Sequence, residues 1–157
     1  MKISAKPVVR KAGVVDVPVI AEIINYHAKD GMMLQRPISK IYENVRDYVV
    51  LEIDSKIVGC GALHVMWSDL VEIRAVALKP EYRGKGLGRP IVEKLFEDLK
   101  ILGIEKVFVL TYNTGFFKHL GFTEIDKSEL PHKIWYECVN CIHFPNCDEV
   151  AMIRSVS

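Results

Sequence analysis

Long hydrophobic runs, an excess of one charge and flexible linker segments are all missing from this sequence. Lys and Arg number 21 against 20 Asp and Glu, which gives a formal net charge of +1. A nucleic-acid or anionic membrane partner usually leaves a basic excess or stripe, and a bilayer-spanning helix needs about 20 apolar residues in a row. We therefore expect neither partner. The opening residues, MKISAKPVV, lack the apolar core of a signal peptide, so a cytoplasmic protein is expected.

Internal repeats and low-complexity segments are also absent, so nothing in the composition divides the chain. The sequence has 157 residues, and half of them are hydrophobic. This is long enough to bury a core and too apolar for a disordered chain. We expect one domain over residues 1–157.

Cysteine is scarce, and three of the four cysteines lie close together near the C-terminus. Disulfides are rare in the cytoplasm, so these residues are expected to be thiols or metal ligands. Three thiolates and an imidazole can hold zinc tetrahedrally, and one segment supplies that set: Cys138, Cys141, His143 and Cys147. Reduced thiols that stabilise a loop are the alternative to structural zinc. Cys60 lies in an apolar run and is expected to be a small core residue.

The first third of the chain predicts a strand and two helices. The strand covers 7–12, and a helix capped by Asp16 follows, with one apolar face made of Val17, Ile20, Ile23, Ile24 and His27. A loop then leads to a second helix, for which Ser39 is the predicted cap and Tyr42 and Val45 are predicted to face inward.

The rest of the chain predicts a sheet with further helices. Strands are expected over 47–54, 56–67 and 70–78, with a tight turn near Asp54 and Ser55. A long helix stopped by Gly103 follows, and its apolar stripe is Ile91, Leu95, Leu99 and Leu102. A strand over 106–112, a short helix over 113–121 and strands over 122–126 and 149–155 complete the order. This order predicts an α/β (α+β) fold with a mixed, mostly antiparallel central sheet flanked by helices.

The segment RGKGLGR, residues 83–89, places three glycines between two arginines where the long helix begins. The first N–H groups of a helix have no partner within it, and the helix dipole favours an anion there. Glycine lets these groups approach a bulky anion, and Arg suits phosphate. The spacing fits neither the Walker A loop nor the dinucleotide fingerprint G-x-G-x-x-G. The segment therefore predicts a different phosphate-bearing ligand.

RGKGLG after VEIRAVALKP resembles the acetyl-CoA signature of the GNAT N-acetyltransferases. NTGFFKHLGF resembles their second landmark, and the predicted element order is similar, so the resemblance covers essentially the whole chain. It implies a GNAT fold with acetyl-CoA as co-substrate. The resemblance implies that acetyl-CoA contacts a strand edge, the glycine loop and the second landmark: Val76, Ala77, Leu78, Arg83, Gly84, Lys85, Gly86, Leu87, Gly88, Arg89, Asn113 and Phe117.

Two further segments, MLQRPISKIYENV and SELPHKIWYECVNCIHFPNCDEVAMI, resemble the short single-domain bacterial N-acetylglutamate synthases. That resemblance implies acetyl transfer to the α-amino group of L-glutamate, the first step of arginine biosynthesis. The long forms of that family carry an additional kinase-like domain. This chain has no room for it, so arginine feedback through such a domain is not expected.

Acetyl transfer to an amine requires the unprotonated amine, so a base is expected. The resemblance implies that Glu72 is this base, acting through water, whereas a strand Glu facing solvent is the alternative. A backbone N–H near Val76 or Ala77 could stabilise the oxyanion.

Many relatives protonate the leaving thiolate with a Tyr where this chain has Phe117. Tyr112 is our candidate for that role, with Thr111 as a substitute. A packing role for the Tyr112 ring is the alternative.

Glutamate has two carboxylates, so its pocket should contain cations. Arg36 is the first candidate, Arg74 the second and Lys133 the third, although each could be an ordinary solvated charge. The long enzymes end in an Arg/Ser-containing strand that this chain replaces with CDEVAMI, which leaves other acceptors open: glutamine, another amine or a protein N-terminus. An acetyl-CoA-binding sensor or interaction module is the non-enzymatic alternative. Sheet edges in such folds often pair, so a homodimer is one expectation.

Overall fold

The computed structural model describes residues 6–31, 33, 35–130 and 149–156. Its strands are β1 (Val8–Lys11), β2 (Tyr48–Ile53), β3 (Lys56–Trp67), β4 (Leu70–Leu78), β5 (Lys106–Thr111), β6 (Thr123–Ile125) and β7 (Val150–Ser155). Its α-helices are α1 (Val17–Ala28), α2 (Ile38–Glu43), α3 (Gly88–Leu102) and α4 (Thr114–His119). Short 3₁₀ helices are η1 (Val14–Asp16), η2 (Val45–Asp47), η3 (Pro80–Tyr82) and η4 (Lys127–Glu129).

In the part of the chain that the structure describes, the strands form one sheet in the order β1-β2-β3-β4-β5-β7-β6. Only β4 and β5 pair in parallel there, and the other neighbours are antiparallel. The predicted mixed and mainly antiparallel sheet is confirmed. The predicted turn between β2 and β3 is confirmed as well, with Asp54 and Ser55 both at positive φ, as a two-residue hairpin turn requires.

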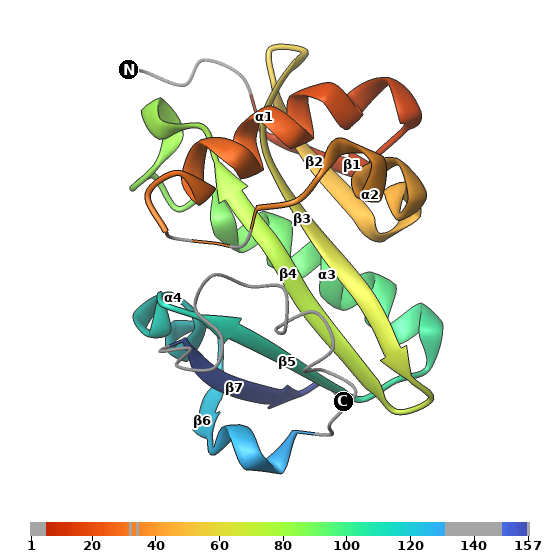
Figure 1. Cartoon of the computed structure of the whole chain (residues 1–157), viewed down its shortest axis with the longest axis vertical. Helices are drawn as coiled ribbons and strands as arrows, with labels where there is room; N and C mark the ends of the chain where they lie inside the picture. The colour runs from red at the N-terminus through yellow and green to blue at the C-terminus, as the bar shows by residue number, and fades with distance from the viewer. Residues whose placement is uncertain (1–5, 32, 34, 131–148, 157) are drawn as a thin grey trace.

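Helices cover both faces of the sheet, with α1 and α2 on one side and α3 on the other (Figure 1). The α3 side holds a core that includes Ile91, Leu95 and Leu99 of the helix. The α1 side holds a second core, in which Ile20, Ile24 and Ile41 contact small residues of the sheet such as Cys60. The predicted buried face of α1 is confirmed in full, since its predicted apolar residues and His27 are all buried.

The strands β4 and β5 run side by side only at their beginnings. They pair from Val71 opposite Val107 to Ile73 opposite Val109, and beyond that point they diverge (Figure 1). The divergence coincides with an irregularity in β4, where Ala75 has a φ of 58° and the register with β3 shifts. A left-handed conformation in a residue other than glycine is strained, and such bulges are typical beside active sites. The fold therefore opens a gap at the carboxyl ends of two central strands.

Several local predictions were wrong. Asp16 occupies the predicted N-cap position of α1, but its carboxylate accepts from Arg10 and the Gly13 N–H, so the expected side-chain bond to the helix does not form. The Arg10 guanidinium accordingly lowers the pKa of Asp16. The helix α2 begins at Ile38 after Pro37, whose φ of −60° is suited to a helix start, so Ser39 lies inside the helix and is not its cap.

Two residues predicted to face inward are exposed. Ile41 is the buried residue of α2, whereas Tyr42 is 42% exposed. At the end of α3, Gly103 adopts the predicted left-handed conformation, with a φ of 73°. Leu102 is 50% exposed because Ile104, after this turn, bonds back to Leu99 and packs on the core instead.

Candidate active site

The glycines of the loop before α3 serve two different purposes. Gly84 and Gly86 have φ values of 75° and 74°, and a Cβ atom there would meet nothing within 4 Å. They are needed for backbone conformation, since side chains disfavour positive φ. A Cβ on Gly88 would lie 2.9 Å from the Phe116 ring, so this glycine permits α3 and α4 to approach closely. Gly86 at positive φ followed by Leu87 at a helical φ of −79° is the kind of pair that gathers backbone N–H groups into an anion-binding concavity.

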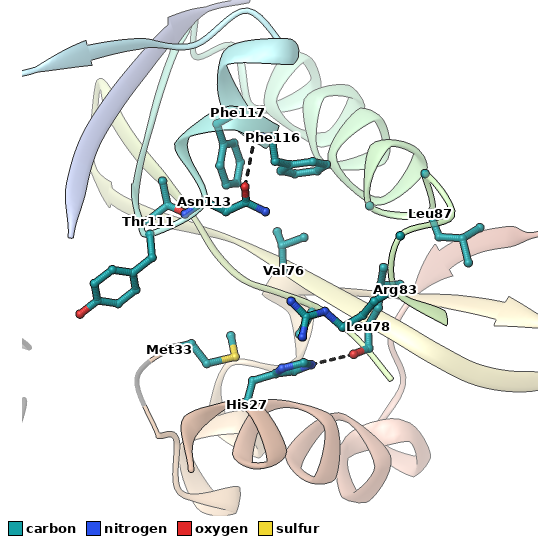
Figure 2. Close-up of a pocket in the computed structure, with 15 residues that line it drawn as sticks. His27, Met33, Val76, Leu78, Arg83, Leu87, Thr111, Asn113, Phe116 and Phe117 are labelled. Atoms are coloured by element: carbon teal, nitrogen blue, oxygen red, sulfur yellow. Dashed lines mark hydrogen bonds between the residues drawn. The ribbon is translucent and has the colours of Figure 1, made fainter. Parts of the chain in front are cut away.

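This loop forms one wall of a cavity of about 370 Å³ where β4 and β5 diverge. The end of β4 forms the floor, and Figure 2 shows Asn113, Phe116 and Phe117 on one side and His27 and Met33 on the other. Arg83 extends its guanidinium into this space (Figure 2). The lining contains ten of the twelve residues expected to contact acetyl-CoA: Val76, Ala77, Leu78, Arg83, Gly84, Gly86, Leu87, Gly88, Asn113 and Phe117.

The remaining two, Lys85 and Arg89, are exposed and lie outside the lining. Arg89 lies 3.5 Å from the Glu93 carboxylate on the next turn of α3. An exposed pair of this kind contributes little to stability, so its main consequence is to hold the Arg89 side chain along the helix.

His27 is a cavity residue that the sequence did not identify as functional. Its imidazole is buried on α1, and Nε2 lies 2.7 Å from the Leu78 carbonyl at the end of β4 (Figure 2). A carbonyl only accepts, so Nε2 donates. The bond ties α1 to the strand that precedes the glycine loop. The same bond occupies the Leu78 carbonyl, one of the strand-edge backbone groups that we expected the pantetheine arm of acetyl-CoA to contact.

The opposite wall is held by two local hydrogen bonds. The Asn113 N–H donates to the Thr111 hydroxyl at 2.8 Å, and the Asn113 side-chain oxygen accepts from the Phe116 N–H at 3.3 Å. Asn113 is therefore the N-cap of α4. Thr111 and Tyr112, our candidates for protonating a leaving thiolate, both line the cavity.

Glu72 lies on β4 before the bulge and is buried, with an exposed fraction of 8%, so the alternative of a solvent-facing side chain is wrong. Arg74 is on the same face of the strand, as predicted, and is also buried. Its Nε donates to the Glu72 carboxylate at 2.8 Å, and its Nη2 contacts the same oxygen. Nη2 also lies 3.6 Å from the Met66 sulfur. Arg74 thus faces the candidate base, whereas we had expected it to face a substrate carboxylate.

Arg36 lies between α1 and α2. Its backbone is fixed by Asn25 of α1, which accepts from the Arg36 N–H at 3.3 Å and donates to its carbonyl at 3.4 Å. Burial raises the pKa of the nearby Tyr48 to about 12, while the charges of Arg36 and Arg74 act in the opposite direction. The positive charges of both guanidinium groups therefore act on the Tyr48 phenol. Within the described ranges, no carboxylate lies within ion-pair distance of Arg36.

The third substrate candidate, Lys133, and the candidate zinc ligands Cys138, Cys141, His143 and Cys147 lie outside the described residues. Among the residues that are described, no group of three or more His, Cys, Asp or Glu side chains could hold a metal, so nothing supports the zinc prediction. Cys60 is fully buried, as predicted, and burial raises the pKa of its thiol to about 12.

No helix in the described ranges is long and apolar enough to cross a membrane.

Comparison with known proteins identifies the family. The acetyltransferase (GNAT) family matches residues 23–122. The chain belongs to this family. It is an acetyl-CoA-dependent N-acetyltransferase of the GNAT type, and both the predicted fold and the resemblance on which it was based are confirmed.

The relatives differ in how much of their length the chain covers. An uncharacterized N-acetyltransferase of Chlorobaculum tepidum is 40% identical over 98% of this chain and 99% of its own. An amino-acid acetyltransferase of Mycobacterium tuberculosis is 42% identical over 84% of this chain and 77% of its own. The amino-acid acetyltransferase of Pasteurella multocida is 32% identical, but this chain matches only 29% of its length.

Several similar solved structures contain coenzyme A or acetyl-CoA. Rv2747 of M. tuberculosis, in complex with CoA and NLQ, has a TM-score of 0.83 and 35% identity, covering 96% of this chain and 99% of that one. N-acetylglutamate synthase of Neisseria gonorrhoeae, complexed with coenzyme A and N-acetyl-glutamate, has a TM-score of 0.87 and 25% identity over 98% of this chain. This chain spans only 36% of the Neisseria protein.

Proposed function

We propose that this enzyme transfers the acetyl group of acetyl-CoA to the α-amino group of L-glutamate, as in the first step of arginine biosynthesis in the cytoplasm. The observation that carries the proposal is the buried Glu72 carboxylate on the strand whose end forms the floor of the cavity. A carboxylate is thereby held a few residues before the backbone that would receive the thioester. The amino-acid acetyltransferases and the Neisseria synthase among the similar proteins support the choice of acceptor.

We assign the cavity to acetyl-CoA. The pyrophosphate would lie against the backbone of residues 84–88 and the first turn of α3, where unpaired N–H groups and the helix dipole favour an anion. Arg83 would add a charge-assisted bond, and Lys85 and Arg89 would add a more distant positive field. Val76 and Ala77 would offer backbone groups to the pantetheine arm, with Asn113 and Phe117 along its other side.

In the proposed reaction, Glu72 removes a proton from the ammonium group of the acceptor, directly or through water. The free amine attacks the thioester carbonyl, and a backbone N–H near Val76 or Ala77 stabilises the oxyanion. The C–S bond then breaks, and the thiolate takes a proton. Tyr112 is the proposed donor. Thr111 is the alternative, because its oxygen already accepts from the Asn113 N–H and its own hydrogen remains to be donated.

Arg36 is the proposed ligand for an acceptor carboxylate. Its backbone is anchored to α1, and within the described ranges its guanidinium has no carboxylate partner, so a dicarboxylate substrate could supply one. Arg74 is proposed to orient the Glu72 carboxylate and to affect the substrate only through Glu72. Lys133 is retained as a further candidate.

The test is a thiol-release assay with acetyl-CoA and a panel of amino acids, run with and without a chelator. We expect free CoA with L-glutamate, equal rates with and without chelator, and much less with L-glutamine or L-aspartate. Release with another amino acid but not with glutamate would refute the acceptor and retain the acetyltransferase. If no amino acid of the panel releases CoA, the proposal that the acceptor is an amino acid is refuted.

A further inference from the structure

We propose that Asp47 and His64 form a proton-relay pair that receives the substrate proton from Glu72 and delivers it to solvent. The inference rests on the proposed role of Glu72 as base. The pair comes from elements that the sequence did not connect with catalysis: Asp47 ends η2, and His64 lies on β3. The His64 Nδ1 lies 2.6 Å from the Asp47 carboxylate.

The hydrogen bond fixes the state of the imidazole. A carboxylate only accepts, so Nδ1 carries the hydrogen, and in the neutral ring Nε2 is left with its lone pair. An imidazole oriented by a carboxylate through one nitrogen and active through the other is the arrangement of a general base and its orienting partner.

The position of His64 connects it to Glu72. The two residues are direct partners in the antiparallel pairing of β3 with β4, so their side chains stand on the same face. Such partners have Cβ atoms about 5 Å apart. In the sheet, β3 lies between β2 and β4, and Asp47 immediately precedes β2. Asp47 occupies Nδ1 of the ring, so Nε2 is the nitrogen left to exchange a proton with Glu72, the direct partner of His64 across the two strands.

Glu72 is more buried than Asp47 and His64, so the pair is better placed to pass a proton to water. The Glu72 side chain is 10% exposed, while those of His64 and Asp47 are both 26% exposed. Glu72 is also bonded to Arg74, and a proton on the carboxylate weakens that ion pair. A proton taken from substrate therefore needs a second acceptor nearer to water, and His64 is adjacent.

The proton moves in three balanced steps. The ammonium N–H bond breaks and an O–H bond forms on Glu72, and then that O–H bond breaks as Nε2–H forms on His64. The imidazolium then releases the Nε2 proton to water, which returns Glu72 and His64 to their starting states, and the net change is one ammonium group converted to a free amine. The charged or titratable groups that the described neighbouring elements bring to this face of the sheet are Asp47 from η2, Tyr48 from β2, and Glu72 and Arg74 from β4. Because His64 acts through Glu72, it is a positioning and relay residue and does not contact substrate.

The experiment compares His64→Ala, Asp47→Asn and the control His119→Ala, an exposed histidine of α4. The acceptor is whichever amino acid the wild-type enzyme acetylates. We expect kcat of His64→Ala to fall by about 10- to 100-fold, with the acetyl-CoA KM unchanged and the pH profile displaced upward, because the acceptor must then lose its proton in solution. Added imidazole should restore part of kcat. Asp47→Asn should show a smaller loss in the same direction, and His119→Ala should behave as wild type.

Two results would overturn the relay while leaving the proposed function intact: a wild-type pH profile in His64→Ala, or a loss of kcat without imidazole rescue and without displacement of the profile. If His64→Ala does not fold, Asp47→Asn decides alone, since it retains the shape of the pair; an unchanged profile in that variant refutes the relay. If the wild-type enzyme acetylates no amino acid, the proposed function and the relay fail together.

Discussion

The two halves of the candidate site are built from different parts of the polypeptide. On the acetyl-CoA side, the proposed ligands are mainly backbone groups of one contiguous loop and the start of one helix, residues 83–89. On the acceptor side, the proposed groups are side chains from three separated segments, with Arg36 before α2, His64 on β3 and Glu72 on β4.

This difference determines how each half tolerates change. A backbone site depends on φ and ψ, so its weak points are the glycines that permit positive φ. A side-chain site depends on individual functional groups, so conservative substitutions that leave the fold intact should still reduce its activity. Each half should therefore respond to its own kind of substitution and leave the other half unaffected.

The largest effect is expected for Glu72→Gln on the acceptor side. The amide can still accept a hydrogen bond from Arg74, but it cannot take a proton, so kcat should fall by about 100- to 1,000-fold. Calorimetry should find the acetyl-CoA affinity unchanged. The control is Glu124→Gln, which removes an exposed carboxylate on β6 and should alter neither quantity. An active Glu72→Gln enzyme with intact acetyl-CoA binding would refute the base assignment.

Arg36→Gln should act on acceptor binding. Loss of a charge-assisted bond worth about 1.5–3 kcal/mol raises the acceptor KM by about 10- to 100-fold, with little change in the KM for acetyl-CoA. Lys40→Gln is the control, since it removes a cation from the exposed surface of α2. Steady-state kinetics with both substrates varied separates the two constants. Equal acceptor KM values in Arg36→Gln and wild type would rule out Arg36 as a carboxylate ligand.

The same contrast explains what the sequence could predict. The glycine loop is a local feature, because its residues are neighbours along the chain. Together with the other predicted acetyl-CoA residues on β4 and near α4, it accounts for the ten of twelve that line one cavity. The helices and strands could be predicted for a similar reason, because hydrophobic periodicity and turn residues are local signals. The Asp54–Ser55 turn and the Gly103 helix stop are examples.

What depended on long-range packing was missed. The bond between His27 and the Leu78 carbonyl joins residues 51 positions apart, and no spacing rule connects them. The pair of Asp47 and His64 escaped notice for the same reason. Arg74 was placed on the correct face of its strand, but its partner could not be read from alternation, because only the folded sheet shows which groups share that face.

On the acetyl-CoA side, Gly86→Ala should weaken binding by about 5- to 30-fold. No atom lies near the added Cβ, so the cost of about 1–2 kcal/mol comes from forcing alanine to positive φ or from the loop relaxing away from it. The acceptor KM at saturating acetyl-CoA should stay unchanged. Gly115→Ala is the matched control, because a Cβ there also meets open space and the residue lies in α4, where alanine is favoured. Equal acetyl-CoA affinities in the two variants would argue against a loop whose conformation binds the ligand.

The smallest effect is expected for Arg83→Gln, because this side chain supplements a backbone site. Arg83 is exposed although it extends into the cavity, so water and salt screen its attraction for phosphate. Acetyl-CoA affinity should fall by about 2- to 5-fold at low ionic strength, and the difference from wild type should shrink as salt is added. Arg89→Gln should change the affinity less, since Arg89 lies outside the cavity lining and beside Glu93. Calorimetric titration of both variants at two salt concentrations measures this order. If Arg83→Gln abolished binding at every ionic strength, the acetyl-CoA side would depend on a side chain in the way the acceptor side does, and the contrast between the two halves would be wrong.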